Sequence, residues 1–219
     1  MSSREMKPKL ADLRKSYEKG TLDFLHVSNN PLDLFQKWFY EAEETDSIDE
    51  ANAMSLTTLG NDGFPRARVV LLKDFSEEGF VFFTNYNSEK GKSLLNHSKV
   101  GLSFYWPSLE RQIIIKGKAE KLSSEKSDQY FDSRPRGSQL GAHVSPQSEV
   151  IPDRKFLEDL QSSLEKKFKN IKIPRPDHWG GILVRPYEIE FWQGRPNRLH
   201  DRICCYFDGI DWKSKRLAP

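Results

Sequence analysis

The chain has 219 residues, which suits one domain of generous size, and its 34 basic and 32 acidic residues nearly cancel. This balance gives no indication of a nucleic-acid-binding surface, and no apolar run approaches the roughly 20 residues that span a bilayer. The segment 1–15 lacks the apolar stretch of a secretory signal, and the two cysteines, Cys204 and Cys205, are adjacent, which suits neither a disulfide framework nor a metal site. We therefore expect a cytoplasmic protein without nucleic-acid or membrane partners and without a bound metal.

The N-terminal part of the chain is predicted to contain two helices. Leu10, Leu13 and Tyr17 recur at helical spacing, which predicts a polar helix over about residues 5–18. Asn30 and Pro31 predict the start of a second helix, because proline fits the first helical turn. The apolar face of this second helix contains Leu32, Leu34, Phe35, Trp38 and Phe39.

From Ala53 onward the pattern changes to strands with intervening helices. Strands are expected at 54–59, 67–73 and 80–84, paired in meander order, and at 100–106 and 111–122, paired as a hairpin. Further strands are expected at 181–184, 188–193 and 202–207, with Trp212 in a closing strand. Helices are expected at 87–97, 123–133 and 153–169, with a loop over 141–146. The order predicts an α+β protein, mainly β: an antiparallel barrel with packed helices in one domain.

The usual nucleotide-binding and metal-binding motifs are absent from the sequence. No Gly-rich loop links a strand to a helix, so neither a Rossmann fold nor a P-loop is indicated. The five histidines are too scattered to predict a zinc site. A phosphate group would therefore have to be held by side chains, chiefly arginine, lysine and serine.

The first candidate anion site is the apolar run between Arg68 and Lys73. An edge strand with solvated ends would have the same pattern. The two cations are an odd number of positions apart, so a regular strand directs them to opposite faces. They can serve one site only through a bulge or a strand end, or they serve two different ligands.

The second candidate combines Tyr130, Arg134 and Ser138. Tyr130 and Arg134 share one face of a predicted helix, which Pro135 ends, so Ser138 begins a new turn with free backbone N–H groups. A phenol, a guanidinium and a hydroxyl that converge in this way suit a phosphate dianion. An exposed arginine at a helix end is the alternative. Gln147 and Ser148, a little further on, are too short a motif to interpret alone.

The third candidate is the segment from Trp192 to Arg202. Arg198, His200 and Arg202 share parity, so an extended chain would put all three on one face. Like charges on one face lower stability unless an anion lies among them, although a solvated strand has the same pattern.

Taken together, these motifs resemble the pyridoxine (pyridoxamine) 5′-phosphate oxidase family, whose fold is the FMN-binding split barrel. The resemblance runs from Leu13 to Pro219. It rests on RVVLLK at 68–73, FFTN at 82–85, ERQ at 110–112, SRPRGSQLGA at 133–142, QSEVI at 147–151, WGG at 179–181, EFWQG at 190–194, RLHDR at 198–202 and the terminal RLAP.

The resemblance implies a homodimer that holds FMN at its interface and oxidises pyridoxine or pyridoxamine 5′-phosphate with O2. Residues 1–28 would form an N-terminal lid segment and 29–219 one split-barrel domain. FMN would be bound by Arg68, Val69, Val70, Leu71, Lys73, Phe83, Thr84, Lys90, Gln112, Gln147, Ser148, Trp192 and Arg202. Substrate would be bound by Arg14, Tyr17, Lys73, Tyr130, Arg134, Ser138, Arg198, Leu199 and His200, with Arg198 and His200 as the catalytic pair.

One departure from the family pattern bears on the cofactor. Glu89 stands between Ser88 and Lys90, where the family usually has arginine. We expect Glu89 to turn to solvent or to a lysine and FMN still to bind. The alternatives are another flavin enzyme on the same barrel, and a non-catalytic flavin or pyridoxal-phosphate carrier.

Overall fold

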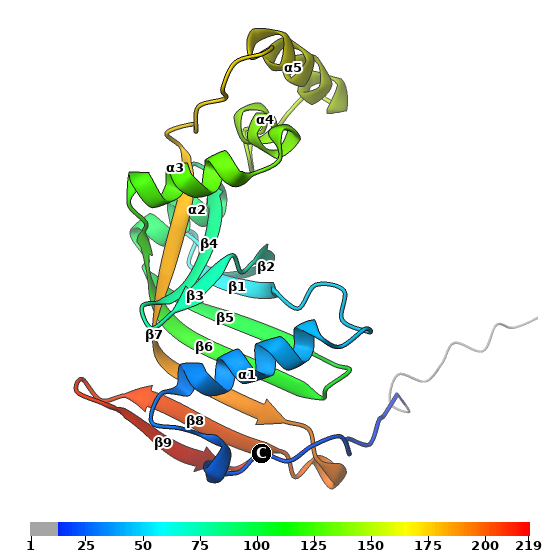
Figure 1. The fold of residues 1–219 in the computed structure, drawn as a ribbon, viewed down its shortest axis with the longest axis vertical. Coiled ribbons are helices and arrows are strands. Elements are labelled where there is room, and N and C mark those ends of the chain that lie inside the picture. The colour runs from blue at the N-terminus through cyan, green and yellow to red at the C-terminus, as the bar shows by residue number, and fades with distance from the viewer. Residues whose placement is uncertain (1–12) are drawn as a thin grey trace, which may run out of the picture.

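Residues 13–219 are described by the computed structural model, in which one nine-stranded antiparallel sheet curls around helix α1 (Figure 1). The helices are η2 (Phe24–His26), α1 (Pro31–Glu43), α2 (Glu89–Asn96), α3 (Ser124–Ser133), α4 (Arg136–Val144), α5 (Arg154–Lys167) and η3 (Pro196–Arg198). The strands are β1 (Ala53–Leu59), β2 (Pro65–Leu71), β3 (Asp74–Ser76), β4 (Gly79–Asn85), β5 (Lys99–Trp106), β6 (Arg111–Lys121), β7 (Trp179–Gln193), β8 (Asp201–Phe207) and β9 (Trp212–Leu217).

Strand β7 organises the sheet. The main order is β2-β1-β5-β6-β7-β4-β3, and β8 and β9 branch from β7. Residues 179–184 of β7 pair with β4, and residues 188–193 pair with β8. Between these two partners β7 keeps only β6 as a neighbour, and Pro186 stands there opposite Gly117, at a register shift. A proline is tolerated at that point because no second strand needs its missing N–H.

The predicted helix starts are confirmed by their caps. The Asn30 side chain accepts a hydrogen bond from the Leu32 N–H, and Pro31 occupies the first turn of α1. Ser88, Ser123 and Asp153 cap α2, α3 and α5 in the same way. Each cap satisfies an N–H group that the helix itself leaves without a partner.

Several sequence predictions are wrong. Residues 13–18 are not helical, and the rest of the predicted first helix lies outside the described residues. The strand at 80–84 does not continue a meander, because β4 pairs with β3 and β7 rather than β2. The strands expected at 181–184 and 188–193 are one strand, since Pro186 does not interrupt β7. Helix α4 extends to Val144 and replaces most of the expected loop.

The main core lies between α1 and the concave face of the sheet. Phe35 of α1 is fully buried, and its ring contacts those of Phe75, Phe80 and Phe104 at centroid distances of 4.8–5.3 Å. Burial alternates along β1 and β5, as expected for strands that bury one face. The amphipathic pattern of α1 is therefore explained by this contact.

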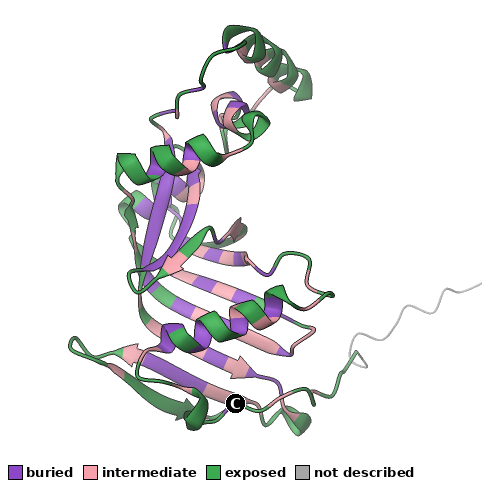
Figure 2. Ribbon diagram, in the orientation of Figure 1, coloured by how far each residue is buried: buried purple, intermediate pink, exposed green. Residues whose placement is uncertain are grey.

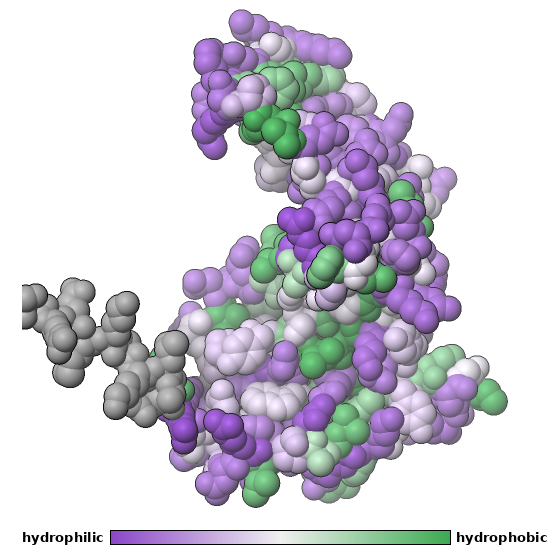
Figure 3. Space-filling model, turned by 180° about the vertical axis from the view of Figure 1, so that it is seen from behind, coloured by the Kyte–Doolittle hydropathy of each residue, from purple (hydrophilic) through white to green (hydrophobic). Residues whose placement is uncertain are grey.

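A second, smaller core lies at the helical end of the molecule, where α3, α4 and α5 gather. It contains Phe131, Leu140, Ala142, Phe168, Ile173 and Trp179. Helix α5 itself buries no residue and lies exposed at the tip (Figure 2). The face of the sheet opposite α1 carries hydrophobic patches among hydrophilic side chains (Figure 3). On β2, Val70 packs against the core, whereas the adjacent Val69 is 70% exposed.

Candidate functional site

A pocket of about 440 Å³ lies between β2, β4 and the α3–α4 corner. We call it the anion pocket. Its walls bring together residues from several separate sequence motifs. They are Val69, Val70, Leu71, Lys73, Phe83, Thr84, Asn85, Lys90, Tyr130, Arg134, Ser138, Gly141, Ala142, Ser145, Gln147 and Trp179.

Arg134 is the most unusual residue of the anion pocket. Its Nη1 atom is buried, and it is the one buried side-chain N or O atom within residues 13–219 that has no hydrogen-bond partner. Burial lowers the pKa of Arg134, against the opposing effect of Tyr130. A buried donor without an acceptor is costly, so this position favours an incoming anion.

Aromatic rings fix the position of Arg134. Phe83 and Tyr130 stack at a centroid distance of 3.7 Å, and Trp179 continues the stack at 5.4 Å from Phe83. The guanidinium carbon of Arg134 lies 4.4 Å from the centroid of Trp179. This cation–π contact holds the guanidinium in the wall of the pocket. Ser138 lies in the first turn of α4, whose N-cap makes no side-chain hydrogen bond, and such a turn favours anions.

A second group of cations lies where β2 approaches the N-terminus of α2. Burial and the nearby charge of Arg68 lower the pKa of Lys90 to about 8, although Glu89 opposes this. The Arg68 guanidinium donates to the carbonyl of Leu56 at 3.3 Å and to the Thr58 hydroxyl at 2.7 Å. Glu89 forms an ion pair with Arg66, not with a lysine, and its N–H donates to the Ser148 hydroxyl at 3.2 Å. Glu89 therefore turns outward as expected, but its charged partner is an arginine and not a lysine.

The remaining predicted residues lie at the other end of the sheet. Gln112 of β6 is opposite Trp192 of β7, and Trp192 is opposite Arg202 of β8, so the three form a row across adjacent strands. Gln112 donates to the Ser103 hydroxyl at 3.1 Å. Arg202 is held by Glu190 at 2.7 Å and donates to the Ala218 carbonyl at 2.8 Å. We call this row, together with Tyr17, Arg198, Leu199 and His200, the C-terminal cluster.

Within the C-terminal cluster, His200 packs between two aromatic rings. Its ring centroid lies 4.7 Å from that of Trp192 and 5.7 Å from that of Tyr17. Its Nδ1 atom accepts the N–H of Arg195 at 3.1 Å, so the neutral imidazole carries its proton on Nε2. Burial and then the Arg198 charge lower the pKa of His200. The neutral form is thereby favoured near neutral pH, with Nε2–H as a donor.

Residues 198–200 do not form the extended strand that the parity argument assumed. Asn197 and Arg198 adopt positive φ angles of 58° and 63° within η3, and β8 begins only at Asp201. The prediction that Arg198, His200 and Arg202 share one strand face is therefore wrong. Left-handed backbone at two non-glycine residues is uncommon and marks a turn that its surroundings enforce.

The structure thus separates the predicted site residues into two groups. Lys73 lines the anion pocket while Arg68 does not; the predicted strand 67–73 ends at Leu71, so strand parity does not extend from Arg68 to Lys73. Other predicted site residues also lie outside the lining of this pocket in the same protomer: Ser148, Gln112, Trp192, Arg202, Arg198, Leu199, His200, Arg14 and Tyr17. Sequence reasoning missed Arg66 and Trp179, and it missed a role for Glu110. Trp179 and Glu110 do belong to the quoted motifs WGG and ERQ, and these motifs were the available signal.

The curled sheet, with helices at one end and the pocket between them, defines a split β-barrel protein. The chain belongs to the pyridoxine/pyridoxamine 5′-phosphate oxidase family. Its residues 41–160 match the family model described as pyridoxamine 5′-phosphate oxidase, and residues 179–219 match the pyridoxine 5′-phosphate oxidase C-terminal dimerisation region.

Individual relatives agree with this membership. A pyridoxine/pyridoxamine 5′-phosphate oxidase of Flavobacterium johnsoniae is 59% identical over 95% of this chain and 98% of its own. The crystal structure of PhzG from Burkholderia lata, in complex with tetrahydrophenazine-1-carboxylic acid, has a TM-score of 0.85 at 28% identity, covering 94% of this chain and all of that one. A pyridoxamine 5′-phosphate oxidase-related, FMN binding protein from Nostoc punctiforme shares the fold, with a TM-score of 0.69 at 16% identity over 88% of this chain and all of its own. Within residues 13–219, no helix combines the length and the apolar character that crossing a membrane requires.

Proposed function

We propose that this chain oxidises pyridoxine or pyridoxamine 5′-phosphate to pyridoxal 5′-phosphate, with FMN as cofactor and O2 as the final acceptor. The proposal rests on family membership over nearly the full length and on the chemistry of the anion pocket. We also propose the cytoplasm as its compartment, since Cys204 and Cys205 are both buried free thiols.

The observation that carries the proposal is the unpartnered Nη1 atom of Arg134. A substrate phosphate would supply the missing acceptor, and Lys73, Tyr130 and Ser138 line the same pocket. The stacked rings of Phe83, Tyr130 and Trp179 hold the arginine in place before the ligand arrives. Less conformational freedom is then lost on binding, which favours affinity.

The residues around the N-terminus of α2 fit the phosphate of FMN. Arg66, Arg68 and Lys90 carry three positive charges and Glu89 one negative charge, which leaves a net +2 opposite a phosphate dianion. The lowered pKa of Lys90, about 8, indicates a cation that is buried without sufficient negative charge nearby. A bound phosphate would relieve both burial and repulsion. Gln112, Trp192 and Arg202 would contact the flavin from the C-terminal cluster.

The residues of the C-terminal cluster would orient the reacting carbon of the substrate. Bound FMN would supply the two-electron acceptor for hydride from C4′ and then reduce O2 to H2O2. Arg198, held on a left-handed turn, would place its charge beside the reacting group. His200 would position the substrate through Nε2–H or move a proton, because its environment favours the neutral form near working pH.

A homodimer would unite the two groups. The anion pocket and the C-terminal cluster lie at different ends of one protomer, and Val69 of β2 is 70% exposed. An isologous dimer would bring the pocket of one protomer to the cluster of its partner, twice. The match of residues 179–219 to a dimerisation region supports this arrangement.

A visible spectrum of the purified protein, followed by pyridoxine 5′-phosphate in the presence of O2, tests the proposal. We expect flavin absorbance, FMN released by acid, and one H2O2 formed per pyridoxal 5′-phosphate. A protein that binds FMN and product without forming H2O2 would be a carrier. FAD in place of FMN would contradict the cofactor assignment.

A further inference from the structure

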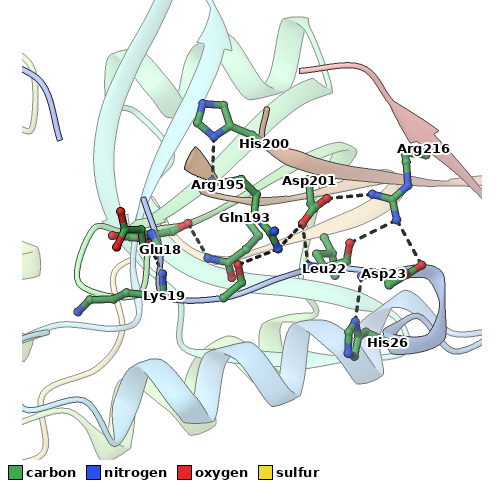
Figure 4. Close-up of polar contacts among 12 residues, drawn as sticks. Glu18, Lys19, Leu22, Asp23, His26, Gln193, Arg195, His200, Asp201 and Arg216 are labelled. Atoms are coloured by element: carbon green, nitrogen blue, oxygen red, sulfur yellow. Dashed lines mark hydrogen bonds and ion pairs between the residues drawn. The ribbon is translucent and has the colours of Figure 1, made fainter. Parts of the chain in front are cut away.

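Residues 15–23 cross the C-terminal cluster without forming a helix or strand, apart from the start of the turn at Asp23 (Figure 4). We call them the strap. Backbone groups of such a segment need partners elsewhere in the protein. The strap finds them at two successive anchors, the first at residues 18 and 19 and the second at residues 20–22.

The first anchor is the carboxylate of Glu110, in the turn between β5 and β6. This side chain is only 2% exposed. Its Oε2 atom accepts the N–H of Glu18 at 2.7 Å and the N–H of Lys19 at 2.9 Å, and Oε1 lies 3.4 Å from the Lys15 ammonium. Burial acts to raise the pKa of Glu110, but these two N–H groups and Lys15 outweigh it, so the pKa lies below its ordinary value. The strap thus supplies hydrogen bonds and a positive charge that stabilise the buried carboxylate.

The second anchor holds the strap beyond Lys19. Arg195 lies 3.4 Å from the Gly20 carbonyl, and Asp201 accepts the Leu22 N–H at 3.1 Å (Figure 4). Arg216 donates to the Leu22 carbonyl at 3.3 Å. This anchor does not involve Glu110. We therefore expect loss of the Glu110 carboxylate to leave residues 20–23 in place and to loosen the part that contains Tyr17, where the Lys19 ammonium still donates to the Ser108 carbonyl at 2.7 Å.

Tyr17 lies where the strap passes over the end of β7. Its ring contacts Trp192 and His200, both at 5.7 Å between centroids. A Cβ atom added to Gly194 would lie 2.7 Å from Cγ of Tyr17, so only glycine permits this approach. The Glu110 carbonyl accepts the Gly194 N–H at 2.7 Å. The same residue therefore fixes both the strap and the strand end against which Tyr17 packs.

We propose that Glu110 is a positioning residue that clamps the strap and thereby sets Tyr17 against His200 and Trp192. It acts through Tyr17 and does not touch the substrate. Its kinetic consequence rests on the proposed function: substrate would enter a C-terminal cluster that is already closed on one side, so loss of the clamp would raise KM while FMN stays bound.

Three variants separate the clamp from the turn that carries it. Glu110 has a φ of 56°, so Glu110→Gly removes the carboxylate without straining the turn. Glu110→Gln keeps an oxygen that can accept both N–H groups but loses the charge. Gly194→Ala keeps the carboxylate and displaces Tyr17. The matched control is Glu120→Gln, which changes an exposed carboxylate on strand β6 that pairs with Arg185.

Limited trypsin digestion measures the clamp without any turnover, through cleavage after Lys15 and Lys19. We expect cleavage about tenfold faster for Glu110→Gly, an intermediate rate for Glu110→Gln and the wild-type rate for Glu120→Gln. KM for pyridoxine 5′-phosphate should rise about tenfold in Glu110→Gly and in Gly194→Ala, with FMN content unchanged.

If trypsin cleaves Glu110→Gly at the same rate as the wild type, the proposed clamp is wrong. Faster cleavage with an unchanged KM would overturn its role in positioning Tyr17. If Glu110→Gly does not fold, Glu110→Gln and Gly194→Ala decide the same two points. A wild-type protein without oxidase activity would remove the proposed function, while the digestion result would still stand for the clamp.

Discussion

The carboxylate of Glu89 in the first turn of α2 is paired with the guanidinium of Arg66 on the neighbouring strand β2. The pair lies beside Arg68 and Lys90, where burial lowers the pKa of both cations and the Glu89 charge opposes that shift in both. The negative charge that this chain carries in place of an arginine is therefore neutralised by a cation from another element.

Glu89 and Arg66 predict a specific pattern of FMN affinity. Wild-type protein stripped of flavin should bind FMN with a micromolar or lower Kd, and Glu89→Arg should bind about 10- to 100-fold more tightly, because a like charge is replaced by a charge-assisted bond. Arg66→Ala should weaken binding by up to about fivefold, since both side chains are partly exposed. Quenching of FMN fluorescence measures each Kd. Wild type that fails to bind, with Glu89→Arg that binds, would favour the carrier over the oxidase.

Arg134 predicts a separation of affinity from stability. Arg134→Met should raise KM for pyridoxine 5′-phosphate about 10- to 150-fold, because the substrate phosphate would lose one hydrogen bond to a charged group. The apoprotein should not be destabilised, because the variant removes a buried donor that lacks a partner. Arg136→Met is the control: its guanidinium donates to the carbonyls of Phe168 and Ile171, so Tm should fall while KM stays. A large drop in Tm for Arg134→Met would contradict our account.

Lys90 predicts a pH dependence of cofactor binding. The pKa of Lys90 is lowered to about 8, so the folded apoprotein loses this charge as pH rises through about 8. FMN affinity should therefore fall above that pH, since binding requires the ammonium, and Lys90→Met should remove the slope. The unfolded chain keeps this proton up to the ordinary pKa of 10.5, so it binds more protons than the folded chain between the two values. The contribution of Lys90 to apoprotein stability should rise over that window, which denaturant titrations at several pH values would measure.

Arg198 and His200 predict a loss of turnover rather than of cofactor. Their alanine variants should lower kcat by about 30- to 1000-fold, or about 2–4 kcal/mol, and keep their flavin. Arg202→Ala should instead release FMN, and it also leaves Glu190 without its partner. Flavin absorbance after gel filtration, measured beside kcat, distinguishes the two. Equal flavin loss in all three variants would show that our division of roles is wrong.

The dimeric site predicts complementation between two variants that are each strongly impaired when the substrate concentration lies at or below the wild-type KM. Arg134→Met disables the anion pocket and Arg198→Ala the C-terminal cluster. In a mixed dimer one site receives both changes and the other receives neither, so random mixing should restore about a quarter of wild-type activity. Each variant alone serves as the control. No recovery in mixed dimers, with mixing verified by mass spectrometry, would place both groups in one protomer.

Motif chemistry and helix caps were predictable from the sequence, whereas the consequences of long-range pairing were not. Asn30, Ser88, Ser123 and Asp153 act locally, so their caps could be inferred from neighbouring residues. Two separate strands at 181–184 and 188–193 were predicted in place of β7, because the sequence does not show that β4 and β8 leave the middle of β7 with one neighbour, where Pro186 is tolerated.

For the candidate site, too, local chemistry was predictable from the sequence and long-range pairing was not. The anion pocket was predicted from its arginine, tyrosine and serine, because a phosphate requires such groups whatever the fold. The turn at Asn197 and Arg198 was missed, since left-handed backbone at these residues is imposed by the surrounding structure. The pairing of Arg66 with Glu89 depends on how β2 approaches α2, which no local pattern reveals.

Strand β7 carries Trp179 in the anion pocket and Trp192 in the C-terminal cluster. Thirteen residues at about 3.3 Å each give a spacing of up to about 43 Å along the strand. The length of β7 therefore sets how far apart the anion pocket and the C-terminal cluster lie in each protomer, and both active sites of a dimer would depend on that distance. Deleting two residues around Pro186 would keep the alternation of faces, yet it would shorten this distance by about 7 Å and misalign both sites at once.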